Sequence, residues 1–264
     1  MTEKHFCLDD SPQFRMLELD EVTSTNDFLR GFRPPEERKV TLATAEFQTA
    51  GRGAGTNHWE SRRGQNLLFS LLIHPRHISA EQLFVLSEAL SLAIYEAIKG
   101  FMPSAPCPYI KWPNDIYCGD HKICGMLIEN DLRGATVENC VMGVGLNVNQ
   151  TEFSQDIPNP ISLAQILGHN IERRFVLERV MEYFLRYYEW TEQGRSAELH
   201  AMYLSRLYRK DEKHYFHDEM GDFEGTIIDV EPSGHLIIRD EVGRQRRYAF
   251  KEVEYVIEMK NEDS

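Results

Sequence analysis

The sequence lacks the features that mark several large classes of proteins. Its 264 residues hold 29 Lys and Arg against 42 Asp and Glu, which gives a formal net charge of −13. This shortage of positive charge argues against general binding to nucleic acids or anionic membranes, because both need a basic face that attracts phosphate groups. No stretch approaches the roughly 20 apolar residues of a membrane span, and the N-terminus has no apolar core of signal-peptide length. We therefore expect a cytoplasmic protein that binds neither DNA nor a membrane.

Cysteine is also scarce. The five cysteines are Cys7, Cys107, Cys118, Cys124 and Cys140. An odd, low number argues against the disulfide framework of a secreted protein, so we expect reduced thiols. His121 lies between Cys118 and Cys124, but no second pair completes a familiar zinc spacing, and we predict no metal centre there.

Hydrophobic periodicity predicts alternating strands and helices up to about residue 210 and only short strands beyond it. We expect strands at 40–45, 67–73, 125–130 and 137–149, helices at 79–100, 175–190 and 197–208, and C-terminal strands at 223–230, 234–240 and 246–250. The first helix begins with a capping-box pattern of Ser79 and Gln82 and stops at Gly100. A turn at 131–134 makes a hairpin of the strands on either side of it.

The composition and the order of these elements predict an α+β protein. Hydrophobic residues make up 42% of the chain and charged residues 27%, which is typical of a globular protein with a buried core. We predict a main domain at 1–210, in which helices pack against a mixed sheet, and a small SH3-like β-barrel domain at 211–264.

The first segment that indicates chemistry is a glycine-rich loop between two predicted strands. Gly51, Gly53 and Gly55 fall within five positions, and Arg52 lies between the first two. Such a loop lets backbone amides approach an anion, and the arginine adds a fixed charge with a forked set of donors. The pattern is neither a Walker A loop nor a dinucleotide-binding fingerprint. By itself, a loop of this composition is more often structural than functional.

The second segment is Lys111-Trp112-Pro113-Asn114-Asp115, followed seven residues later by Lys122. Lys122 lies where a polar turn becomes an apolar strand, so its ammonium can be held at the sheet edge and partly desolvated. That position suits the stabilisation of an anionic transition state. The alternatives are that both lysines are solvated surface charges and that Asp115 forms a turn.

Two further segments carry weaker signals. Gly143 and Gly145 lie on the same face of a predicted strand, which suggests that a ligand, such as a flat ring, or another backbone lies against that face. The run Ser24-Thr25-Asn26 precedes an apolar stretch and reads simply as a helix N-cap.

The order of these segments from about residue 18 to 150 resembles the biotin protein ligases, and the helices and small β domain that follow agree with that family's architecture. The resemblance implies that the carboxylate of biotin attacks the α-phosphate of ATP to give biotinyl-AMP and pyrophosphate. A lysine of the biotin carboxyl carrier domain of acetyl-CoA carboxylase, or of a related carboxylase, then takes the biotinyl group. The resemblance also implies a requirement for Mg²⁺ and a monomer or weak homodimer.

The resemblance further implies roles for individual residues. Those implied at the biotin site are Ser24, Thr25, Asn26, Gln48, Gly51, Arg52, Gly53, Ala54, Trp59, Lys122, Gly125, Gly143 and Gly145. Those implied at the ATP site are Arg52, Lys111, Asn114, Lys122 and Asn147. Lys122, Arg52 and Asp115 are implied as catalytic, with Lys122 central and Asp115 either orienting it or assisting Mg²⁺. Trp112 is the other aromatic that would line the site with apolar surface.

The sequence departs from the family pattern at two places. The family loop commonly carries further arginines, whereas this chain has Ala54 and Asn57 at those positions, and its third glycine, Gly55, comes one residue early. The N-terminal departure is that only 23 residues precede Ser24, fewer than the roughly 50 that a winged-helix domain needs. We therefore expect the ligase without the DNA-binding repressor domain.

Two other functions remain open at this level. A lipoate or octanoate ligase shares the fold and also modifies a carrier lysine, and substrate competition would distinguish it. A non-enzymatic module would use the cluster Arg244-Gln245-Arg246-Arg247 to bind a nucleic acid or peptide. That cluster is short and the chain is acidic, so a solvated hairpin end is the better interpretation.

Overall fold

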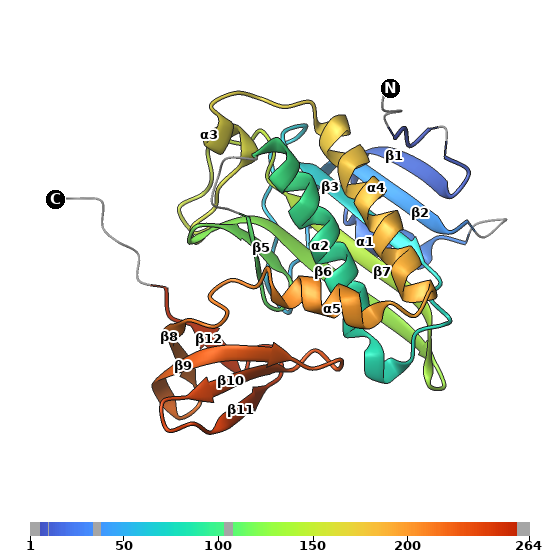
Figure 1. The fold of residues 1–264 in the computed structure, drawn as a ribbon. Helices are drawn as coiled ribbons and strands as arrows, with labels where there is room; N and C mark the ends of the chain where they lie inside the picture. Colours follow the sequence, from blue (N-terminus) through green and yellow to red (C-terminus); the bar gives the residue numbers. More distant parts are fainter. Residues whose placement is uncertain (1–5, 10, 34–37, 103–107, 258–264) are drawn as a thin grey trace, which may run out of the picture.

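A mixed sheet lies at the centre of the structure, which is a computed structural model describing residues 6–9, 11–33, 38–102 and 108–257. Within these ranges seven strands pair in the order β1-β2-β3-β7-β6-β5-β4 (Figure 1). They are β1 (Phe14–Val22), β2 (Val40–Gln48), β3 (Leu67–Ile73), β4 (Tyr109–Lys111), β5 (Asp115–Cys118), β6 (His121–Arg133) and β7 (Thr136–Leu146). β1 and β2 run parallel and the other neighbours antiparallel, which confirms the predicted mixed sheet.

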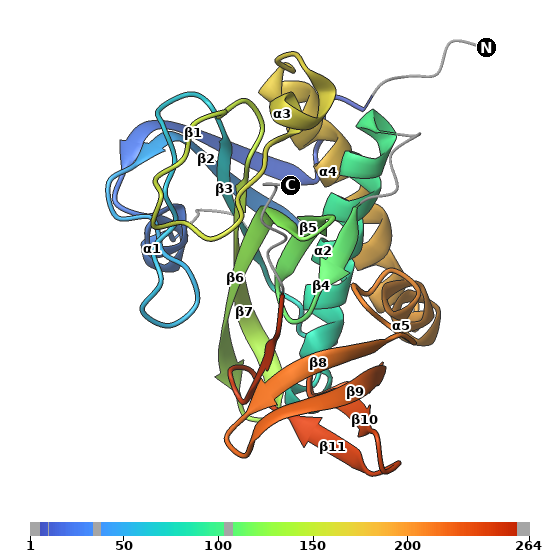
Figure 2. The same ribbon diagram turned by 90° about the vertical axis from the view of Figure 1, so that its left-hand side faces the viewer.

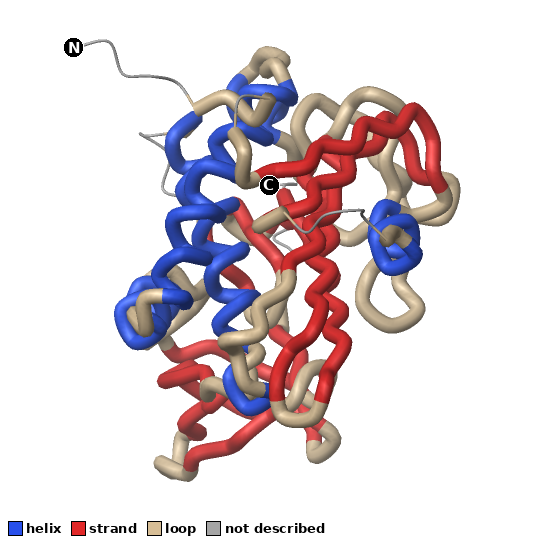
Figure 3. The backbone as a smooth tube through the Cα atoms, turned by 90° about the vertical axis from the view of Figure 1, so that its right-hand side faces the viewer, coloured by secondary structure: helices blue, strands red, loops and turns tan. Residues whose placement is uncertain are grey.

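Helices cover the two faces of this sheet unequally. α2 (Phe84–Phe101), α4 (Arg173–Glu192) and α5 (Ser196–Leu204) form a layer on one face, whereas α1 (Thr25–Gly31) lies on the other (Figures 2 and 3). The short α3 (Leu163–Leu167) lies in the connection that leads from β7 to α4. Every residue of β3 is buried, as expected for an apolar strand in the middle of a sheet covered on both faces. The face that carries only α1 leaves room for a ligand site.

The predicted bounds of two helices, α2 and α5, need correction. Residues Ala80–Gln82 form a short 3₁₀ helix and α2 begins only at Phe84, because Ser79 bonds the Gln82 side chain and caps no backbone amide. α2 also continues through Gly100 to Phe101. α5 ends at Leu204 and not at 208, because the backbone at 206–208 hydrogen-bonds to Ile110 of β4.

The predicted β-hairpin exists, but its turn is narrower than expected. Pairing between β6 and β7 continues to Arg133 and Thr136, so the turn at 131–134 is wrong and the chain reverses at Gly134. Gly134 has a φ of 63°, a backbone conformation that glycine adopts without strain. β7 ends at Leu146, three residues earlier than predicted, as the chain leaves the sheet.

The C-terminal part of the described chain is a second, antiparallel sheet. Its five strands within the described ranges pair in the order β11-β10-β9-β8-β12. They are β8 (Lys213–Asp218), β9 (Gly221–Val230), β10 (Leu236–Asp240), β11 (Gln245–Tyr248) and β12 (Val253–Tyr255). The α+β prediction is therefore confirmed, although the sequence analysis missed β1, β4, β5, β8 and β12. The domain boundary at residue 210 stays a prediction.

Polar contacts join both the central sheet and the helix layer to this second sheet. The indole N–H of Trp112 donates to the carbonyl of Gly234, at 2.9 Å. His200 of α5 lies between two carboxylates, with Nδ1 at 2.7 Å from Glu88 of α2 and Nε2 at 3.2 Å from Asp229 of β9. Only the doubly protonated imidazole can donate to both, so this contact depends on charge.

The described cysteines are free thiols. Cys7, Cys118, Cys124 and Cys140 form no disulfide, and Cys107 lies outside the described residues. Burial raises the pKa of the Cys124 and Cys140 thiols, which keeps them protonated and unreactive. Among the helices that the structure describes, none combines the length and apolar character needed to cross a membrane.

We predict that His200→Ala destabilises the protein in a pH-dependent way. The hydrogen bond to Glu88 raises the pKa of His200 above its unfolded value, so the stabilisation is complete below about pH 6.5 and is lost as the pH rises through the folded-state pKa. Loss of the ring leaves Glu88 buried without this partner, at a cost of about 2 kcal/mol. Urea unfolding should show a larger difference from the unsubstituted protein at pH 6 than at pH 9.

His217→Ala is the matched control, since His217 also pairs with a carboxylate, Asp222, but on an exposed hairpin. Exposed ion pairs contribute little to stability, so the unfolding free energy of His217→Ala should stay close to that of the unsubstituted protein at both pH values. A His200→Ala difference that is equal at both pH values would contradict the proposed role of the imidazolium.

Candidate functional site

The floor of the candidate site is a stretch of sheet without side chains. Gly143 and Gly145 of β7 and Gly125 of β6 lie on the face that carries α1, and Gly125 pairs directly with Gly145. A Cβ on Gly143 would overlap the amide of Asn26, and one on Gly145 would overlap the ring of Trp59. The sequence analysis expected a ligand or backbone against these glycines, and the flat ring found there is the protein's own Trp59.

A cavity of about 480 Å³ opens above this floor, a volume typical of small-molecule sites. It is lined by all of the site residues that the resemblance implied except Gly51, namely Ser24, Thr25, Asn26, Gln48, Arg52, Gly53, Ala54, Trp59, Lys111, Trp112, Asn114, Asp115, Lys122, Gly125, Gly143, Gly145 and Asn147. The lining also includes residues that the sequence analysis missed, among them Phe153, Asp156, Ile157 and Phe250. These four lie in connecting segments with no motif of their own, so no local signal marks them.

One wall of the cavity is built from hydroxyl and amide groups. Ser24 caps α1, and the backbone N–H and hydroxyl of Thr25 donate to Gln48 Oε1, at 2.7 and 3.0 Å. The hydroxyl of Ser70, on the same face of β3, contacts Thr25 Oγ1 at 2.7 Å and Asn26 Oδ1 at 2.6 Å. The N-cap interpretation of Ser24 is confirmed. Ser70 holds Thr25 and Asn26 in place, and the sequence analysis missed it because it lies within an apolar strand.

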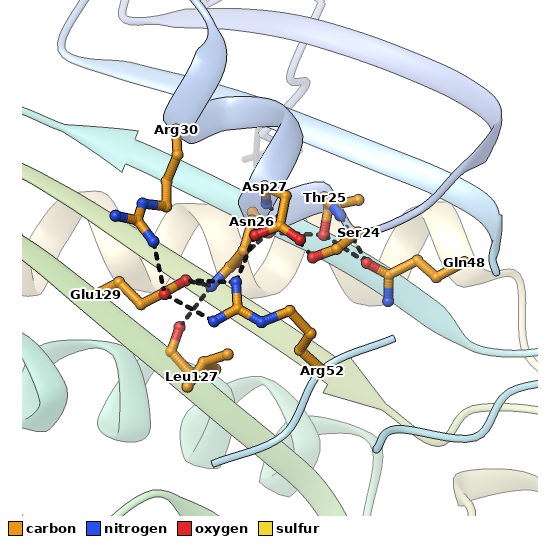
Figure 4. Close-up of polar contacts among 10 residues, drawn as sticks. Ser24, Thr25, Asn26, Asp27, Arg30, Gln48, Arg52, Leu127 and Glu129 are labelled. Atoms are coloured by element: carbon orange, nitrogen blue, oxygen red, sulfur yellow. Dashed lines mark hydrogen bonds and ion pairs between the residues drawn. The ribbon is translucent and has the colours of Figure 1, made fainter. Parts of the chain in front are cut away.

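A second wall is a cluster of charges around Arg52 (Figure 4). Its guanidinium contacts Asp27 at 2.5 Å and Glu129 at 2.9 Å. Arg30 and Asn26 also donate to Glu129, at 3.1 and 2.9 Å. The hydrogen bond to Glu129 raises the pKa of Arg52. Partial burial would raise the pKa of Glu129, but the hydrogen bonds from Asn26 and Arg52 outweigh this effect and lower that pKa. The cluster ties the glycine-rich loop to α1 and β6.

The glycine-rich loop itself is a narrow turn and not an open ring of amides. The amide of Gly53 donates to the carbonyl of Asn57, at 2.8 Å, and the amide of Trp59 donates to Gly51, at 3.0 Å. A Cβ on Gly51 would lie 2.6 Å from the carbonyl oxygen of Trp59. Gly51 therefore permits the close approach of the two loop strands, which explains why it lies behind the cavity and does not line it.

Lys122 is held by a carboxylate beneath the loop. Its Nζ lies 2.7 Å from Asp115 Oδ1 and 5.8 Å from the centre of the Trp59 ring. The side chain is 31% exposed, which excludes a fully solvated surface lysine. The indole N–H of Trp59 is buried and has no hydrogen-bond partner within the described ranges, so it is a donor available to a bound molecule.

Lys111 lies between two tyrosine rings. Its Nζ is 5.0 Å from the centre of Tyr117 and 4.6 Å from that of Tyr255, which belongs to the C-terminal sheet. Burial lowers the pKa of Lys111, although the nearby Asp115 opposes this effect. The alternative of a solvated surface charge is therefore wrong for Lys111 too.

Asn114 and Asn147 mainly fix the backbone around the cavity. Asn114 Nδ2 donates to the carbonyl of Met126, at 2.6 Å, and so joins the β4–β5 turn to β6. Asn147 Nδ2 donates to the carbonyl of Ile161, at 3.1 Å. Among the residues that the structure describes, no three His, Cys, Asp or Glu side chains gather as a metal site would require.

Comparison with known proteins gives consistent relatives. A model of the biotin/lipoate A/B protein ligase family matches residues 18–147. The biotin–acetyl-CoA-carboxylase ligase of Paracoccus denitrificans is 27% identical over 207 residues, covering 76% of this chain and 85% of the relative. The bifunctional ligase/repressor BirA of Bacillus spizizenii is 27% identical over 243 residues, covering 87% and 71%. The Aquifex aeolicus biotin protein ligase, solved with biotin and ATP, has a TM-score of 0.76 and 26% identity, covering 91% and 99%.

The matched residues, the two sheets and the cavity define the class: the chain belongs to the biotin/lipoate A/B protein ligase family. Within this family, the relatives and the solved structure to which the chain is similar are biotin protein ligases.

We predict that Gly145→Ala loosens the glycine-rich loop. The added Cβ meets the Trp59 ring, and overpacking of this kind costs about 1–3 kcal/mol. Hydrogen exchange of the amides at 51–59 should therefore become about tenfold faster or more. Mass spectrometry of a peptide spanning this loop measures the change.

Gly100→Ala is the matched control, because nothing lies within 4 Å of a Cβ added there. In this variant the amides at 51–59 should exchange at the same rate as in the unsubstituted protein. Equal exchange in Gly145→Ala and the unsubstituted protein would show that Trp59 does not hold the loop.

Proposed function

We propose that this chain activates biotin with ATP, forming biotinyl-5'-AMP and pyrophosphate, and then transfers the biotinyl group to a lysine of a carrier domain. The observation that carries the proposal is one cavity in which a wall of uncharged donors and acceptors meets Arg52, Lys111 and Lys122. Biotin needs the uncharged donors and acceptors for its ring and the cations for its carboxylate. ATP needs the cations for its phosphates.

The hydroxyl and amide wall suits the ureido ring of biotin. That ring carries N–H and C=O groups, which must be paired when they are buried. The hydroxyl of Thr25 donates to Gln48 and the Asn26 amide oxygen accepts from Ser70, so the donors and acceptors of this wall are paired within the protein. Their exchange for bonds to the ring would cost little, because hydrogen bonds are replaced and not lost. Gly143 and Gly145 let Asn26 and Trp59 lie close against the sheet, and both of these side chains line the cavity that would hold the ring.

Lys122 and Arg52 are the residues we propose for charge stabilisation. When a carboxylate oxygen attacks the α-phosphate, negative charge grows on both the phosphoryl oxygens and the leaving pyrophosphate. Lys122 projects under the loop at the point where the two substrates would meet, and Asp115, 2.7 Å away, fixes its orientation. Arg52 lies on the loop above, oriented by Asp27 and Glu129. Fixed cations of this kind lower the barrier because they need no reorganisation during the step.

The residues fit a magnesium ion that is held chiefly by the nucleotide. Asp115, Asp156 and Glu60 line the cavity, and Mg²⁺ commonly binds through one or two carboxylates together with substrate phosphates. Asp115 Oδ1 is buried and contacts Lys122 Nζ at 2.7 Å, and a carboxylate in this position still has lone pairs that can accept a further ligand. When bound, the ion would neutralise phosphate charge.

The second step requires a carrier lysine to reach the adenylate. Its neutral amine attacks the biotinyl carbonyl, a C–N bond forms, AMP leaves and the amine loses a proton. We propose the biotin carboxyl carrier domain of acetyl-CoA carboxylase or a related carboxylase as the acceptor, by analogy with the ligase of P. denitrificans. The monomeric or weakly dimeric state and the cytoplasmic location stay predictions.

The direct test follows pyrophosphate release with biotin and ATP and then transfer to an acetyl-CoA carboxylase carrier domain. We expect release that depends on biotin, and a mass increase on one carrier lysine. Octanoate and lipoate serve as competing acids, because the family includes ligases for lipoate. Turnover of either acid in preference to biotin would overturn the proposal.

We predict that Lys122→Ala and Arg52→Ala each slow adenylate formation by about 100-fold or more, since each removes a charge aimed at the developing anion. Single-turnover measurement of pyrophosphate release checks this. Arg179→Ala, which removes an exposed arginine paired with Glu182 on α4, should leave the rate unchanged. Near-normal release in both site variants would rule out the assigned roles.

A further inference from the structure

Lys251 has an unusual backbone conformation. It follows Phe250 in the connection between β11 and β12, and its φ is 70°. Residues with a Cβ rarely adopt this left-handed conformation, which costs roughly 1 kcal/mol relative to glycine. Strain of this kind is retained where the side chain has a use. At this position the backbone favours glycine, and the chain has a lysine.

The side chain of Lys251 crosses from the C-terminal sheet to the glycine-rich loop. A Cβ added to Gly55 would lie 3.2 Å from Lys251 Cε and closer still to its Nζ. The preceding residue, Phe250, lines the cavity, and Lys251 Nζ lies 5.8 Å from the centre of its ring. The ammonium therefore lies against the glycine-rich loop, next to two residues that line the cavity, Ala54 and Phe250, and Gly55 has no side chain to displace it.

Lys251 also differs from the other cations of the site in its charge balance. Arg52 is paired with Asp27 and Glu129, and Lys122 is paired with Asp115. Lys111 is enclosed between two tyrosine rings. The ammonium of Lys251 has no carboxylate partner in the part of the chain that the structure describes. Its charge is thus available to an anion without the loss of an existing ion pair.

We propose that Lys251 is a nucleotide-binding residue whose ammonium binds the β- and γ-phosphates of ATP and the pyrophosphate that leaves. This inference rests on the proposed function. If the α-phosphate lies near Lys122 to react with the carboxylate, the outer phosphates can extend past the lining residues Ala54 and Phe250, next to which Lys251 lies. A lysine carries three donors on a flexible stem and can follow the leaving group outward.

The test compares Lys251→Gly, Lys251→Arg and the control Lys213→Ala. Lys251→Gly removes the charge and also relieves the backbone strain, so it should fold at least as well as the unsubstituted protein. We expect the KM for ATP and the inhibition constant of pyrophosphate each to rise about tenfold, the value of one partly exposed charged hydrogen bond. The Kd for biotin without nucleotide should not change. Lys251→Arg should retain most of the affinity.

Lys213→Ala removes the same charge from the same sheet at a residue paired with Glu224, and it should leave all of these constants unchanged. An unchanged KM for ATP in Lys251→Gly would overturn the inference, as would equal weakening of biotin and ATP, which would indicate a merely structural role. If the unsubstituted protein releases no pyrophosphate from biotin and ATP, the proposed function fails. Calorimetric titration of pyrophosphate into the unsubstituted protein and Lys251→Gly still decides the role of Lys251, with weaker binding by the variant expected and equal binding contradicting it.

Discussion

The site depends on a sheet surface from which side chains are absent. Gly143, Gly145 and Gly125 leave the backbone of β6 and β7 open on one face, and the Trp59 ring and the Asn26 amide occupy the volume that Cβ atoms would fill. The opposite face of the same strands is buried under helices, where Met142 and Val144 belong to the main core. Strand alternation therefore lets one pair of strands serve stability on one side and binding on the other.

Local electrostatics reconcile an acidic protein with the anionic substrates that we propose. The net charge of −13 disfavours the approach of a triphosphate, but the cavity gathers cations whose positions are fixed by partners. Asp27 and Glu129 orient Arg52 and partly neutralise it, whereas Lys111 is shielded from solvent by tyrosine rings. Such pairing positions the charges before a ligand binds and limits their repulsion of one another.

Sequence patterns predicted the parts of the fold whose burial is periodic or continuous. β3 and the helices α2 and α4 could be read from their apolar residues, because burial on a sheet or along a stripe imposes that pattern. β8 and β12 were not predicted because apolar and polar residues alternate only weakly in these short strands. Helix ends were misplaced where tertiary contacts decided them, as at Ile110, whose hydrogen bonds to 206–208 end the helical path after α5.

The sequence by itself determined the family and predicted many of the residues that line the cavity, because those depend on residue types at set intervals along the chain. Only the tertiary structure decided how they meet: that Glu129 holds Arg52, that Tyr255 covers Lys111, and that Lys251 reaches Gly55. Each of these contacts joins segments distant in sequence. No local pattern encodes such a contact, because it arises from the packing of the second sheet and the loop against the first.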